Sequence, residues 1–127
     1  MKQVLKNIGI VILGLVIGMI INMGLIFLGG IIITPSESFE PMNAINWDLK
    51  HFIFPFLAHS LGTFSGAFIV SKLSKKSSVI MSLIVGFYFL SGGIYMVTIL
   101  PAPTWFILLD IFISYIPMAL LAWKMTK

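Results

Sequence analysis

Hydrophobic residues fall into four long runs along the chain. The runs contain almost no Lys, Asp or Glu and cover residues 8–33, 52–70, 79–100 and 105–123. A helix that spans a bilayer needs about 20 apolar residues, within a range of about 17–25. The pattern therefore predicts an all-α membrane protein: a bundle of four transmembrane helices forming a single transmembrane domain over residues 1–127.

The ends of these helices are marked less clearly than their centres. The first run exceeds the usual length, which predicts a tilted helix or one with a protruding end. The third and fourth runs are separated only by Pro-Ala-Pro-Thr at residues 101–104, which predicts a tight turn. Pro55 leaves two alternatives for the second helix. It is either the first helical residue, or it kinks a helix that begins near Asp48.

The connection over residues 34–50 is the only long one and is expected on the outer side. Glu40-Pro41 is a sequence that opens helices, so a short helix is one expectation here. Its apolar side chains would rest on the membrane surface; they are Phe39, Met42, Ile45 and Trp47. A plain solvated loop is the alternative.

Composition excludes a soluble globular protein. The chain is 59% hydrophobic and only 9% charged, whereas soluble domains contain roughly a quarter charged residues. The N-terminal lysines ahead of an apolar run resemble a signal peptide. The run is longer than the roughly 7–15 residues of a signal sequence and has no small-x-small cleavage site. We therefore expect an uncleaved first span that acts as a signal anchor.

The lysines predict the orientation. Seven of the eight would lie on one side of a four-span protein: Lys2, Lys6, Lys72, Lys75, Lys76, Lys124 and Lys127. Three of the four acidic residues would lie on the other side together with Lys50: Glu37, Glu40 and Asp48. The positive-inside rule then places both termini in the cytoplasm, with the protein in a bacterial inner membrane. Because the lysines sit in small groups at segment ends, the net charge of +4 does not indicate nucleic acid binding.

Small residues recur on single faces of the predicted helices. The candidates for helix packing are Gly14 and Gly18 in the first span, Gly62 and Gly66 in the second, and Gly86 in the third. Small side chains let helix backbones approach closely in lipid, where no hydrophobic force drives helices together. These positions predict the packing seams of the bundle.

Asp110 is the sharpest chemical signal because a carboxylate inside a span costs about 2.5–3.5 kcal/mol. It should face the bundle interior and find a partner, or be protonated. The spans contain no Lys or Arg, so His59 is the best partner. Counting about 1.5 Å per residue from the outer end, Asp110 lies about 8 Å deep and His59 about 10 Å deep.

Other polar residues also gather in the outer half of the predicted bundle. They are Asn22, Thr63, Ser91, Tyr95 and Ser114. One hypothesis is an outward-opening ligand or ion pocket around a His59–Asp110 pair, with Asn22 at its floor. The alternative is a buried hydrogen-bond network that only holds the helices in register.

Several chemistries find no support. The chain has no Cys, which excludes disulfides and thiolate sites. His51 and His59 would stand about 12 Å apart along a helix, too far to bind one metal ion. We therefore expect no metal, no cofactor and no catalytic residue.

Two strings in the chain are distinctive. They are FPFLAHSLGT at residues 54–63 and LPAPTWF at residues 100–106, the second followed by Asp110, Tyr115 and Pro117. Together they resemble a group of small four-pass bacterial inner-membrane proteins. The resemblance covers most of the chain and implies a fold, but no activity.

Three functions follow as expectations. The first is a non-enzymatic membrane component that packs in the lipid bilayer with itself, as a homo-oligomer, or with the subunits of a larger complex. The second is a small transporter, channel or ligand binder that uses the pocket around His59 and Asp110. The third is an enzyme acting on a lipid or quinone, with His59 as its base.

Overall fold

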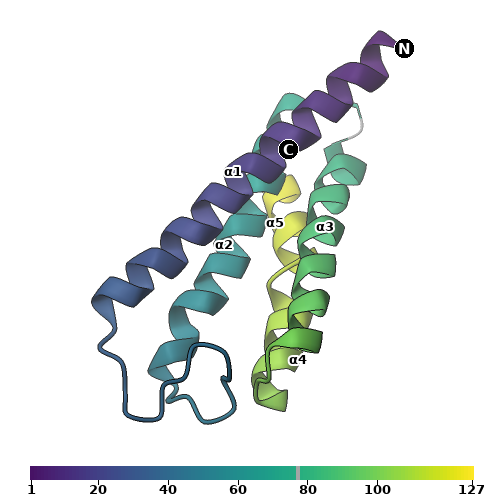
Figure 1. Ribbon diagram of the computed structural model, residues 1–127. Helices are drawn as coiled ribbons and strands as arrows, with labels where there is room; N and C mark the ends of the chain where they lie inside the picture. Colours follow the sequence, from purple (N-terminus) through teal and green to yellow (C-terminus); the bar gives the residue numbers. More distant parts are fainter. Residues whose placement is uncertain (77) are drawn as a thin grey trace.

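The computed structural model describes residues 1–76 and 78–127, and within them it contains helices and no strand (Figure 1). The helices are α1 (Lys2–Ile32), α2 (Lys50–Leu73), α3 (Ser78–Ile99), α4 (Thr104–Ile113) and α5 (Ile116–Met125). Segments α4 and α5 follow each other as one interrupted helix. Counted in this way, the described part contains four helices long and apolar enough to cross a membrane. The predicted all-helical architecture is confirmed, and it is compatible with a multi-pass membrane protein.

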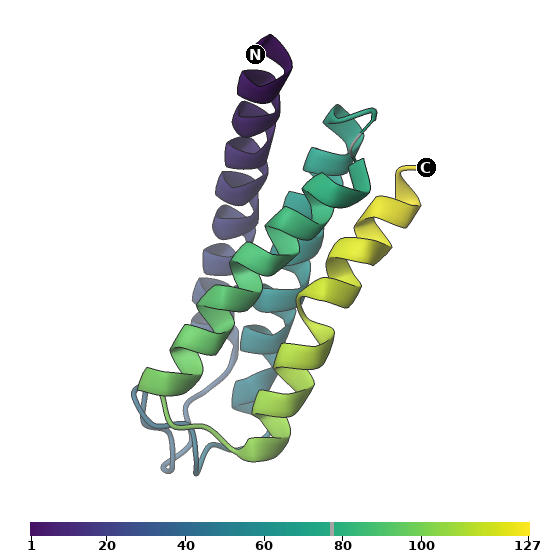
Figure 2. The ribbon, with the colours of Figure 1, turned by 90° about the vertical axis from the view of Figure 1, so that its right-hand side faces the viewer.

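The helices run side by side between two distinct ends (Figures 1 and 2). Both chain termini and the α2–α3 connection lie at one end, called here the terminal end. The α1–α2 connection and the α3–α4 turn lie at the other, the loop end. Helix α1 runs obliquely to α3, and its first turns extend beyond the other helices (Figure 1). At about 1.5 Å per residue its length is about 46 Å, well above the roughly 30 Å of a hydrocarbon core.

Helix α2 settles the position of Pro55. The helix begins at Lys50, so Pro55 lies inside it rather than at its start. The backbone N–H groups of His51 and Phe52 donate to the carbonyls of Asp48 and Leu49, 3.0 Å in each case, which begins the helix ahead of the proline. Of the two alternatives, the helix that begins near Asp48 is the one observed.

Residues 40–47 form turns instead of a short surface helix. A helix here would need the N–H of Ala44 to bond the carbonyl of Glu40. The Ala44 N–H instead donates to the carbonyl of Pro101 (2.8 Å), and the indole N–H of Trp47 donates to the carbonyl of Glu40 (2.7 Å). The first bond ties the α1–α2 connection to the α3–α4 turn, and the second closes the connection on itself. Phe39 stacks on Trp47 with ring centroids 4.9 Å apart.

Helices α1 and α2 cross with their backbones in contact. A Cβ atom on Gly18 would stand 2.7 Å from the carbonyl oxygen of Gly62, and one on Gly66 would stand 2.6 Å from that of Gly14. The two pairs of glycines thus face each other across the crossing. This approach is possible only because none of the four has a side chain.

The apolar core lies between this crossing and the terminal end. Its buried residues are Ile10, Ala67, Val70, Met81, Val85, Ala119 and Ala122. Gly86 lets α3 approach α5 here, since a Cβ on it would lie 2.9 Å from that of Ala119. An apolar core therefore fills the bundle on the terminal side of the crossing.

Candidate functional site

The site is built around one contact between α2 and α4. The Nδ1 atom of His59 lies 2.9 Å from both carboxylate oxygens of Asp110. Asp110 is buried, whereas the side chain of His59 is 27% exposed. The sequence indicated these two residues as partners, and the structure has them in direct contact.

Asp110 has further donors on both oxygens. The Ser114 hydroxyl donates to Oδ1 (2.9 Å), and the Tyr115 hydroxyl donates to Oδ2 (3.2 Å). Ser60 of α2 donates in turn to the Ser114 hydroxyl (3.0 Å). A buried carboxylate is costly unless hydrogen bonds compensate it. Here each oxygen has two partners, so the carboxylate is satisfied from within the protein.

A break in the fourth helix makes the Tyr115 contact possible. Pro117 has no N–H for the carbonyl of Ile113, and its ring would clash with that carbonyl. Helix α4 accordingly ends at Ile113 and α5 begins at Ile116. In an unbroken helix residue 115 would point about 140° away from residue 110. The break turns Tyr115 back so that its hydroxyl reaches Asp110.

Tyr115 was part of a distinctive string in the sequence but was not among the candidate site residues. The available signal was Pro117, which predicts a helix interruption just where a tyrosine follows Asp110 and Ser114. The Tyr115 ring lies beside that of His59, with centroids 6.0 Å apart and planes 26° apart. Tyr115 therefore contacts both members of the pair.

Two clefts adjoin His59. The first, the deep cleft, has a volume of about 310 Å³, and its lining includes Asn22, His59 and Thr63 together with Phe89 and Tyr115. The second, the loop-end cleft, has a volume of about 220 Å³ and is mainly apolar, with Trp47, Phe52 and Phe106 in its wall. His59, Gly93 and Met96 line both clefts. His59 thus stands where a polar and an aromatic space meet.

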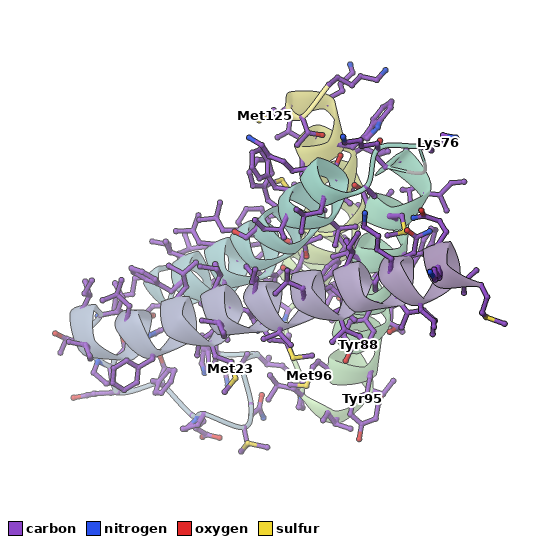
Figure 3. All side chains as sticks on the ribbon, turned by 90° about the horizontal axis from the view of Figure 1, so that it is seen from above. Met23, Lys76, Tyr88, Tyr95, Met96 and Met125 are labelled. Atoms are coloured by element: carbon purple, nitrogen blue, oxygen red, sulfur yellow. The ribbon has the colours of Figure 1, made fainter. Side chains whose placement is uncertain are left out.

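The clefts lie on the side of the bundle where α1 and α3 diverge. In Figure 3, Met23 of α1 and Tyr95 and Met96 of α3 point to the same side of the molecule. All three are well exposed, and Tyr95 and Met96 line the deep cleft. At the loop end, Ala44 and Trp47 line the loop-end cleft and partly cover it. The deep cleft is therefore bordered by α1, through Asn22, and by α3.

The remaining candidate residues divide into two groups. Thr63 is fully buried, Asn22 is partly buried, and both line the deep cleft. Neither Thr63 Oγ1 nor Asn22 Oδ1 has a hydrogen-bond partner among residues 1–76 and 78–127. Ser91, by contrast, is exposed and donates to the carbonyl of Tyr88 in its own helix (2.6 Å), so it does not join the cluster. Tyr95 stands at the rim.

His51 lies outside the His59–Asp110 cluster and contacts the α1–α2 connection instead. Its Nε2 accepts the backbone N–H of Ser36 (3.1 Å), and its ring packs on Phe39 at 4.5 Å between centroids. It thereby ties the α1–α2 connection to α2. No group of three His, Asp or Glu side chains that could hold a metal ion occurs in the described part of the chain.

The chemistry available at the site is hydrogen bonding beside a fixed imidazole. Because Asp110 engages Nδ1, the Nε2 atom lies on the opposite edge of the ring of His59, whose side chain is 27% exposed. That nitrogen is free to bond a molecule in either cleft. Thr63 and Asn22 offer two more polar atoms that the protein itself leaves unbonded.

In comparisons with protein-family models, curated proteins and solved structures, no match to the chain was found. Function is therefore argued from the geometry of the site.

Proposed function

We propose that this chain is a multi-pass membrane protein that binds a small lipophilic molecule in the space between α1 and α3, with His59 as the central contact. The observation that carries the proposal is the buried Thr63 hydroxyl, which lines the deep cleft without a partner. A buried polar group without a hydrogen bond costs about 1–3 kcal/mol. A bound molecule that bonds this group would recover that free energy.

Binding is better supported than conduction through a pore. The polar groups around Asp110 lie toward the loop end, and Asn22 and Thr63 are the deepest of them. Beyond these residues, toward the terminal end, the bundle is filled by the apolar core around Val70 and Val85. A polar solute that reached the deep cleft would find no polar path onward through this chain.

Binding is also better supported than catalysis. His59 is the one side chain at the clefts whose geometry fits a base. Thr63 and Asn22 provide hydrogen bonds, and both oxygens of Asp110 are engaged by protein donors. These groups fix the position of a ligand, and no reaction is needed to explain them.

We further propose that both termini lie in the cytoplasm, in a bacterial inner membrane. The support is the charge asymmetry of the sequence, because seven of the eight lysines fall at or beside the terminal end. Lipid would then surround the exposed apolar side chains of α1 and α3. The deep cleft would open sideways into the hydrocarbon of the outer leaflet.

The binding proposal is tested by identifying molecules that co-purify with the protein. Gly92 lines the deep cleft, and a Cβ built on it has nothing within 4 Å. Gly92→Phe should therefore place a large side chain at the wall of the cleft and obstruct it without displacing neighbours. Gly24→Phe is the matched control, since its surroundings on α1 are equally open and it lines neither cleft.

The proteins are extracted into native-lipid nanodiscs, and bound small molecules are identified by mass spectrometry. A molecule enriched with the wild type and Gly24→Phe, but lost with Gly92→Phe, supports the proposal. An identical set of molecules in all three samples, or nothing enriched in any of them, contradicts it.

A second candidate function is that of a non-enzymatic component that packs against another protein. Its support is α1, whose most apolar 18-residue window is only 17% buried within the chain. The glycines of the α1–α2 crossing do not add to it, because they already contact each other. Chemical cross-linking in membranes, followed by sizing of the products, separates a monomer surrounded by lipid from a dimer or larger complex.

A further inference from the structure

The two clefts differ in polarity, and the more polar one lies deeper in the proposed membrane. The aromatic loop-end cleft is closer to the surface, and the polar deep cleft is closer to the middle of the bundle. A phospholipid has the opposite order, with its polar headgroup at the surface and its chains below. A ligand that fits both clefts must carry its polar group at hydrocarbon depth.

Charge limits that polar group further. Within the described part of the chain, no lysine lines either cleft, so an anionic headgroup would have no cationic partner. An amine would need a free carboxylate. Asp110 offers none, because His59, Ser114 and Tyr115 engage its two oxygens. An unpaired charge at this depth is expensive, so the polar group should be uncharged.

The unbonded atoms of the deep cleft determine which hydrogen bonds the ligand's polar group must donate and accept. Asn22 Oδ1 can only accept a hydrogen bond, whereas the Thr63 hydroxyl can donate or accept. His59 borders the same cleft. A ketone or ether oxygen has no proton for Asn22, whereas a hydroxyl donates one hydrogen bond and accepts others. A hydroxyl is thus the smallest uncharged group that satisfies these atoms.

We propose that the ligand is an uncharged lipophilic alcohol or phenol, whose hydroxyl donates to Asn22 and accepts from Thr63 beside His59 in the deep cleft. Its apolar part passes Met96, which lines both clefts, and rests against Trp47 and Phe106 in the loop-end cleft. This inference rests on the proposed binding function and specifies the chemical class of its ligand.

The test uses a pair of probes that differ in one proton. These are 4-octylphenol and its methyl ether, 4-octylanisole, titrated calorimetrically into the full-length protein in nanodiscs with empty nanodiscs as the reference. One net hydrogen bond is worth about 0.5–1.5 kcal/mol, so the phenol should bind up to about tenfold more tightly than the ether. Thr63→Val keeps the shape of the side chain and removes its hydroxyl. It should weaken phenol binding several-fold and leave ether binding unchanged.

Ser91→Ala is the control, because that hydroxyl bonds its own helix outside the clefts. It should change neither affinity. If Thr63→Val does not fold, Asn22→Leu tests the same contact from α1. A wild-type protein that binds the two probes equally would overturn hydroxyl recognition while leaving the binding function intact.

Two other outcomes also overturn the inference. One is phenol binding that neither Thr63→Val nor Asn22→Leu weakens, since the hydroxyl would then lie elsewhere. The other is no binding of either probe to the wild type. In that case the co-purification experiment still decides separately whether the chain binds a lipophilic molecule of another class.

Discussion

Tyr115 packs against Gly93 so closely that its hydroxyl and ring occupy the space a Cβ atom on residue 93 would need. The same hydroxyl donates to Asp110. The absence of a side chain at one position of α3 therefore allows a hydrogen bond between two residues of the fourth helix. Gly93 thus determines the position of the Tyr115 side chain, although Gly93 has no functional group of its own.

Gly93→Ala should displace Tyr115 and lower the free energy of unfolding by about 1–3 kcal/mol, the usual cost of overpacking. The neighbouring Gly92→Ala is the matched control, because its added methyl group has nothing within 4 Å. It should be neutral or stabilising by up to about 1 kcal/mol, since alanine favours helix. Unfolding by SDS in mixed micelles measures both changes. Equal effects of the two substitutions would contradict the packing of Tyr115 on Gly93.

His59 and Asp110 should behave as one unit in a double-mutant cycle. Asp110→Asn and His59→Gln should each destabilise the protein by about 1–3 kcal/mol, because each leaves a partner unsatisfied. The double variant should lose about 1 kcal/mol less than the sum, as expected for a hydrogen bond within a membrane protein. Asp110→Asn combined with Ser91→Ala is the control and should be additive. Strict additivity of the first pair would mean that the contact contributes nothing to stability.

The α1–α2 crossing should tolerate no added side chain at its centre. Gly66→Ala would place a methyl group against the Gly14 carbonyl, where a Cβ stands only 2.6 Å away. The helices must separate, at an expected cost of about 1–3 kcal/mol. Gly30→Ala, on an open part of α1, should cost less than about 0.5 kcal/mol. Thermal unfolding of the two variants in the same detergent compares them directly, and similar midpoints would contradict the crossing.

Pro117→Ala should join α4 and α5 into one regular helix, since the new N–H can bond the carbonyl of Ile113. Tyr115 would then rotate away from Asp110. Backbone ¹³C chemical shifts of Ser114 and Tyr115 should move to helical values. Pro55→Ala, in α2, should leave those shifts unchanged. A break that persists in Pro117→Ala would show that tertiary contacts, rather than the proline, maintain it.

The absence of cysteine allows a clean test of the proposed topology. Single cysteines at Lys127 and at the exposed Met42 would be labelled with a membrane-impermeant maleimide in intact bacterial cells expressing the protein. We expect labelling of Met42→Cys only, with Lys127→Cys reacting after the cells are lysed. Labelling of Lys127→Cys in intact cells would reverse the orientation.

The four helices could be derived from the sequence alone, because their cause is local. A long apolar run is suited to lipid, and in lipid a single segment can satisfy its own backbone hydrogen bonds only as a helix. The glycine spacing and the partnership of His59 with Asp110 were also visible. A carboxylate inside an apolar segment needs a partner, and the spans contained no Lys or Arg and no second His.

Tertiary structure alone decided the rest. Ser91 shares the depth of the polar cluster, yet it lies on an exposed face of α3 and does not line the deep cleft. Tyr115 joins the site because Pro117 interrupts a helix and Gly93 leaves space for its ring. Sequence spacing determines which residues share a face of a helix. Which face meets which neighbour, and where a cleft remains between them, depends on how the helices pack together.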